Sequence, residues 1–132
     1  MCFATIRSIP VSLLLALLLA ADANAQARPC TPGNCTITVT VTACNQPGGI
    51  SVDAPLVEVS KAVNMRWVIV PSRFAFAANG IQLDPPHPQF RVQNSPRPNE
   101  FRLHNAKTQV GDYHYLVNVE GCLPLDPLIR NR

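Results

Sequence analysis

The sequence carries little charge and few aromatic side chains: 14% of its 132 residues are charged and 6% are Phe, Trp or Tyr. Its basic residues are scattered singly, without the clusters and interleaved aromatic residues that nucleic-acid grooves use. The formal net charge is only +3, so we expect no nucleic-acid partner. No segment after residue 25 is long and apolar enough to form the helix of about 20 residues that spans a membrane.

The sequence also lacks the common catalytic and phosphate-binding patterns. Ser60, Ser72 and Ser95 have no nucleophile-elbow context, and no glycine-rich phosphate loop is present. The acids are spread singly along the chain, whereas glycoside hydrolysis requires two that face one cleft. Cys-x-x-Cys pairs and paired histidines, which are typical of zinc sites, are missing as well. We therefore expect a protein that is not an enzyme, with no catalytic residues and no cofactor.

What is present begins with a secretory signal at the N-terminus. Arg7 precedes an apolar run over residues 11–21, and Ala23, Asn24 and Ala25 form the small-residue pattern of a cleavage site. We expect residues 1–25 to be a signal peptide that is removed after Ala25. The remaining 107 of the 132 residues suit one domain. The mature protein is then expected to be periplasmic or secreted, and free of any membrane span.

Four cysteines follow the predicted cleavage point: Cys30, Cys35, Cys44 and Cys122. An even number in a small exported chain indicates two disulfides, for which three connectivities are possible. The turn-forming residues 31–34 favour a bridge between Cys30 and Cys35, which leaves Cys44 with Cys122. The second bridge predicts that the two strands that precede its cysteines run side by side in the same direction.

Period-two alternation indicates strands along the rest of the sequence, and no window shows a helical period. Trp67 is expected as a core anchor, and Phe74 and Phe76 on one face of a short strand. Asn79 and Gly80 are expected in a turn. The expected strands lie at 36–42, 50–52, 56–60, 65–70, 74–76, 81–83, 90–92, 101–103 and 111–122. We predict an all-β sandwich over 26–122 and an extended C-terminal tail over 123–132.

The order of these segments resembles a cupredoxin-like domain. The run over residues 111–115, Gly-Asp-Tyr-His-Tyr, looks like the family's Gly-x-Tyr-x-Tyr motif at the start of the metal-ligand strand. The segments 56–61 and 63–67 look like the strand, turn and strand before the first histidine ligand. The resemblance implies a Greek-key β-sandwich, with an immunoglobulin-like sandwich as the alternative. The chain is also similar to small uncharacterised exported proteins of Gram-negative bacteria that share an Asn-Gly-Ile turn and an Asp-Pro ending.

The copper ligands of that family are missing at the matching positions. Val117 stands where the cysteine ligand is expected, Cys122 where a histidine is expected, and Asp126 near the place of the methionine. Residues 68–80 contain no histidine, although one is expected there. A type-1 copper site needs two imidazoles and a thiolate. The resemblance therefore implies a cupredoxin-like domain that lacks type-1 copper.

These observations favour an exported, non-enzymatic binding or structural module with a protein or small-ligand partner. The alternative is a periplasmic copper-binding protein that uses His87, His104 and His114 as non-standard ligands. His87 lies in a proline-rich loop, and His114 has the opposite parity from Tyr113, which places it toward solvent or the far side of its sheet. We therefore predict no metal site, and keep the three histidines as the alternative.

Overall fold

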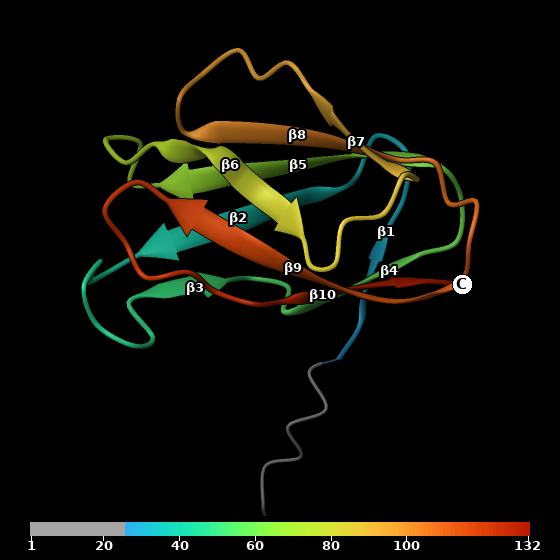
Figure 1. Cartoon of the computed structure of the whole chain (residues 1–132), viewed down its shortest axis with the longest axis horizontal. Helices are drawn as coiled ribbons and strands as arrows, with labels where there is room; N and C mark the ends of the chain where they lie inside the picture. The colour runs from blue at the N-terminus through green and yellow to red at the C-terminus, as the bar shows by residue number, and fades with distance from the viewer. Residues whose placement is uncertain (1–25) are drawn as a thin grey trace, which may run out of the picture.

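The computed structural model describes residues 26–132 of the chain (Figure 1). The predicted signal peptide lies outside the described residues. Within them the chain is all-β, and none of its segments is a helix that could cross a membrane. The strands are β1 (Arg28–Cys30), β2 (Thr36–Val41), β3 (Ile50–Val52), β4 (Leu56–Val59), β5 (Val63–Val70), β6 (Phe76–Leu83), β7 (Phe90–Gln93), β8 (Glu100–Asn105), β9 (Gly111–Val119) and β10 (Leu128–Asn131).

The strands form two five-stranded sheets that pack as a sandwich. Sheet I has the order β1-β4-β10-β9-β6, and sheet II has the order β3-β2-β5-β8-β7. Both sheets are mixed, because β4 pairs in parallel with β1 and β10, and β2 pairs in parallel with β5. In Figure 1, β8, β5 and β2 form the upper layer and β9 and β10 lie below them. The expected all-β class is confirmed.

Alternating burial along the strands builds the core between the sheets. On β5, the side chains of Met65, Trp67 and Ile69 are at most 1% exposed, while the residues between them face outward. This is the face that the sequence period predicts. Trp67 packs edge-to-face against Tyr115 of β9, with ring centroids 5.5 Å apart. The predicted core anchor therefore contacts the opposite sheet.

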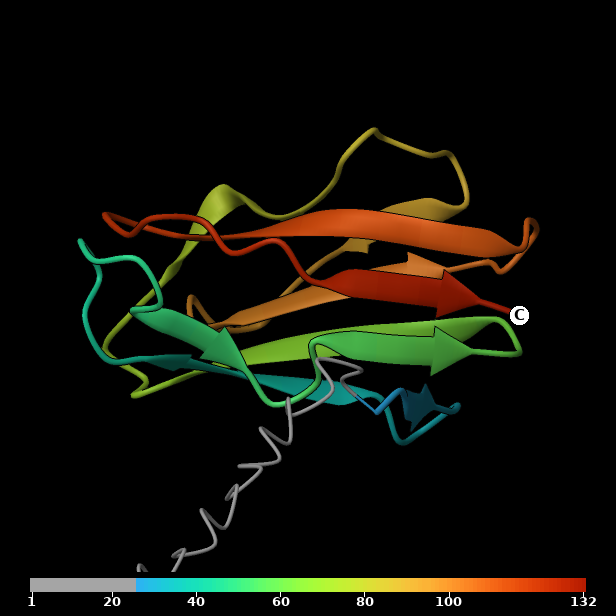
Figure 2. The same ribbon diagram turned by 90° about the horizontal axis from the view of Figure 1, so that it is seen from below.

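The C-terminal segment belongs to the sandwich. We predicted an extended tail over 123–132, but Leu128–Asn131 form β10, which lies between β4 and β9 in sheet I (Figure 2). Ile129 on this strand is fully buried. The prolines of the segment, Pro124 and Pro127, precede the strand and therefore remove no donor from its ladders. The sandwich therefore includes residues 128–131.

The expected turn at Asn79 and Gly80 is wrong, because β6 runs through both residues. The pairing of β6 with β9 shifts register between Phe76 and Ile81, as at a β-bulge. Gly80 packs closely here, since a Cβ on it would lie 2.8 Å from the Cβ of Phe76 and 2.9 Å from the ring of Phe101. The Asn-Gly pair therefore marks an irregularity within a strand.

Both favoured disulfides are present, and two such bridges fit an oxidising compartment. Cys30 and Cys35 close a tight turn in which the N–H of Asn34 donates to the carbonyl of Thr31 at 2.9 Å. The Cys44–Cys122 bridge follows β2 and β9, which run in the same direction in Figure 1. However, β2 lies in sheet II and β9 in sheet I. The expectation that these strands are neighbours is wrong, and the bridge joins the two sheets.

Candidate functional site: a basic face on sheet II

Three arginines from three different strands share the outer face of sheet II. The strand register places Arg66 of β5 opposite Arg102 of β8, and Arg102 opposite Gln93 of β7. One row along, Asn64, His104 and Arg91 face the same side. Thr36 of β2 extends the first row. We call this surface the basic face and define it by Thr36, Asn64, Arg66, Arg91, Gln93, Glu100, Arg102 and His104.

Glu100 is the anchor of the basic face. Its carboxylate is 2% exposed and accepts a hydrogen bond from the Nε of Arg66 and another, at 3.1 Å, from the Nε of Arg102. Both arginine side chains remain 43% exposed. Within the part of the chain that the structure describes, Glu100 is the only acceptor hydrogen-bonded to either guanidinium. Their terminal amino groups are therefore held in place and open to a ligand.

The ionised form of Glu100 is the stable one. Burial alone would raise the pKa of this carboxyl, but the hydrogen bonds and positive charges of Arg66 and Arg102 outweigh it and hold the pKa below its ordinary value of 4.5. Glu100 therefore stays charged at neutral pH and balances one of its two arginines. One positive charge remains on the cluster.

A shallow hollow of about 360 Å³ lies beside the two guanidiniums. Arg66 and Arg102 line it together with three uncharged polar side chains, Thr36, Asn64 and Gln93. The planar fork of a guanidinium matches the geometry of a carboxylate or a phosphate, and two oxygens can be held at once. The arrangement is suited to bind an oxyanion, with amide and hydroxyl groups at its edge.

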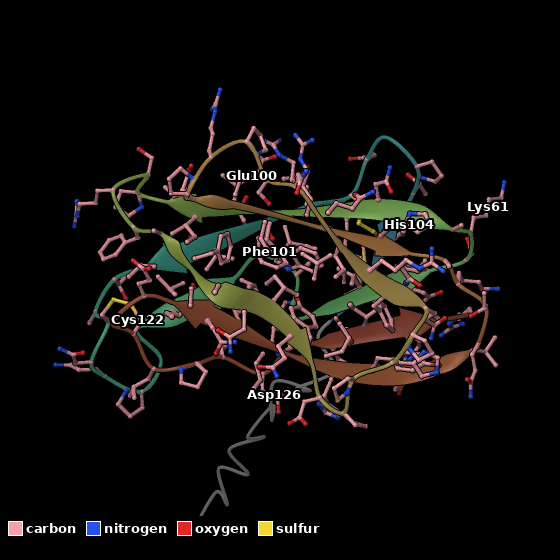
Figure 3. The ribbon with its side chains drawn as sticks, turned by 45° about the horizontal axis from the view of Figure 1, so that its top comes forward. Lys61, Glu100, Phe101, His104, Cys122 and Asp126 are labelled. Carbon is pink, nitrogen blue, oxygen red and sulfur yellow. A yellow bond between two sulfur atoms is a disulfide. The ribbon has the colours of Figure 1, made fainter. Side chains whose placement is uncertain are left out.

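The arginines of the basic face outnumber the acids beside them, whereas the arginines of sheet I do not. There, Arg130 pairs with Asp112 at 2.8 Å and Arg132 with Glu58 at 3.0 Å, one acid for each arginine. On sheet II, the outer faces of β5, β7 and β8 carry three arginines and one acid, Glu100, which pairs with Arg66 and Arg102. Figure 3 shows Glu100 on the outer side of its sheet, with Phe101 in the interior and Asp126 on the far side of the molecule.

The three histidines that we considered as metal ligands are kept apart. His87 lies in the β6–β7 loop, 2.9 Å from the amide oxygen of Gln109. His104 is on sheet II, with its Nδ1 2.7 Å from the side-chain oxygen of Asn64. His114 is on sheet I, exposed as predicted, and 3.4 Å from Asp126. Among residues 26–132 no group of three potential metal ligands comes together.

The positions that match copper ligands in the resemblance have other roles in the structure. Val117 is fully buried in the core of β9. Cys122 is bonded to Cys44, and Figure 3 shows this bridge at one end of the sandwich. The side chain of Asp126 is 58% exposed and lies beside His114. These residues hold the fold together or face solvent.

No protein-family model matches this sequence, and a search of curated proteins found no match either.

The basic face cannot be identified from the sequence alone, because its arginines are far apart along the chain. Each of them does occupy a strand position of outward parity, and that was the available signal. Bringing them together requires the register of β5, β8 and β7, which a strand pattern alone does not specify.

Proposed function

We propose that this chain is an exported, non-enzymatic binding module whose basic face recognises carboxylate groups of a protein partner. The observation that carries the proposal is the pair Arg66 and Arg102, fixed by the buried carboxylate of Glu100 while their outer groups face a hollow. Side chains that are already ordered lose less entropy when they bind. The predicted signal peptide and the two disulfides support export.

A carboxylate-bearing protein fits this face better than a nucleic acid does. Single-stranded nucleic acids are bound by basic grooves in which bases stack on aromatic side chains. The residues that define the basic face include three arginines and one histidine, and the others are small or polar. Arginine is also enriched in protein interfaces, where its fork recognises carboxylates. We therefore favour an acidic protein surface or segment.

We further propose that the sandwich is cupredoxin-like. Parallel pairing of β2 with β5 and of β4 with β10 supports this class over the immunoglobulin-like alternative, whose two sheets are antiparallel. Core and disulfide residues at the ligand positions favour binding over electron transfer. The copper-binding alternative gains no support from His87, His104 and His114, because each has its own separate partner.

The test uses fluorescein-labelled hexaglutamate and fluorescence anisotropy at low salt. The variant R66Q/E100Q/R102Q removes both arginines together with their acid, so that no buried charge is left unpaired. We expect it to bind at least tenfold more weakly than the native protein. The matched control D112N/R130Q/R132Q makes the same change in net charge on sheet I and should bind within about twofold of native. An equal loss in both variants, or no binding by the native protein, would contradict the proposal.

A further inference from the structure

β7 is an edge strand with an unpaired side. It lies last in sheet II and pairs only with β8 among the described strands. The carbonyl of Gln89 accepts from the N–H of Ala106 at 2.9 Å, just before the strand. Because bonding direction alternates along an antiparallel strand, Arg91 and Gln93 direct their backbone groups to β8 and Val92 directs its own to the free side. Such an edge can pair with another strand.

An apolar groove lies along the inner side of this edge. Val92 is opposite Leu103, a core residue, yet it is 68% exposed because no strand covers it. The groove has a volume of about 230 Å³ and runs between β7 and β6 of sheet I, which slopes obliquely across the view in Figure 1. Its apolar lining includes Ile81, Leu83, Phe90, Val92, Phe101 and Leu103.

The outer side of the same edge belongs to the basic face. Arg91 and Gln93 are both exposed, and the register sets them beside His104 and Arg102. The free edge of β7 therefore separates an apolar groove from a cationic surface. Side chains of an extended strand alternate between two sides, so a strand paired here would place one set in the groove and the other on the arginines.

We infer that the free edge of β7 takes up, by strand addition, an extended segment of the partner in which acidic and apolar residues alternate. The inference rests on the proposed function and names the kind of partner. Main-chain bonds to Val92 provide the pairing, and the basic face and the groove select the two kinds of side chain. A second copy of this chain fits less well, because β7 paired with β7 would set the cationic basic faces of two copies side by side.

The test compares two labelled peptides of identical composition by fluorescence anisotropy. One repeats the dipeptide glutamate-valine four times, and the other has four glutamates followed by four valines. We expect the alternating peptide to bind at least tenfold more tightly. The variant V92P removes an N–H from the free side without removing a bond to β8, a position where edge strands tolerate proline. It should abolish the difference between the peptides, whereas V92T, which keeps the N–H, should retain it.

Binding of hexaglutamate tests the proposed function independently of strand addition. If hexaglutamate binding depends on Arg66 and Arg102 but the two valine-containing peptides bind equally, strand addition is overturned and the proposed function stands. If none of the three peptides binds, both are overturned. If sedimentation shows the native protein as a dimer and V92P as a monomer, a second copy occupies the edge and the inference fails.

Discussion

Trp67 donates its indole N–H to the hydroxyl of Tyr115 over 3.2 Å, at a place where both side chains are fully buried. The two residues belong to β5 and β9, so the bond links sheet II to sheet I. Burial raises the pKa of the Tyr115 hydroxyl, which therefore stays neutral. The contact satisfies the only polar atom of the largest core side chain and links the two sheets.

Replacing Tyr115 with phenylalanine should lower the free energy of unfolding by about 1–3 kcal/mol, because the buried indole N–H loses its acceptor. Urea unfolding measures the change. Tyr113→Phe is the matched control, since the Tyr113 hydroxyl is exposed and donates to the carbonyl of Gln109. We expect the control to lose less than about 1 kcal/mol. A Tyr115→Phe protein as stable as the native one would show that this bond does not hold the sheets together.

Removing the inter-sheet disulfide should cost more than removing the short one. Cys44 and Cys122 are 78 positions apart in the sequence, and Cys30 and Cys35 are 5 apart. The entropy of loop closure predicts a loss of about 4 to 5 kcal/mol for C44S/C122S and about 2 kcal/mol for C30S/C35S. Denaturant unfolding of the two double variants compares these values directly. The reverse order of stability would exclude the loop-length explanation.

Gly80→Ala should destabilise the protein by about 1–3 kcal/mol, because the added methyl group would push against Phe76 and Phe101. Asn79→Ala is the control, since the Asn79 side chain is exposed and donates a hydrogen bond to the side-chain oxygen of Gln82. We expect a change within about 0.5 kcal/mol for it. Thermal and urea unfolding measure both variants. Equal effects would favour a turn made by the Asn-Gly pair over the close packing of Gly80.

The stability that Glu100 contributes should depend on pH. Its pKa is lowered in the folded protein, so the unfolded chain binds protons more readily at acidic pH. The contribution is therefore fully present above the ordinary carboxyl pKa and is lost as the pH falls through the lowered one. We expect the difference in unfolding free energy between the native protein and Glu100→Gln to shrink on acidification. Parallel pH profiles for the two proteins would contradict this assignment.

The sequence pattern predicted those features that depend on residues close together in the chain. Trp67 was assigned to the core from the alternation along one strand, and the Cys30–Cys35 bridge from a turn-forming run. β10 was missed because Pro124 and Pro127 interrupt the apolar pattern, although they lie outside the strand itself. The basic face was missed for a different reason: Arg66, Arg91 and Arg102 meet only through strand register, which is a long-range property.

The most direct test of the central claim observes the arginine side chains themselves. In nitrogen-15 labelled protein, the Nε–H resonances of Arg66 and Arg102 can be followed by NMR during titration with unlabelled hexaglutamate. We predict saturable shifts at these two resonances, with much smaller changes at Arg130 and Arg132 on the opposite sheet. Equal shifts at all four arginines, or none at Arg66 and Arg102, would contradict the assignment of the basic face as the binding site.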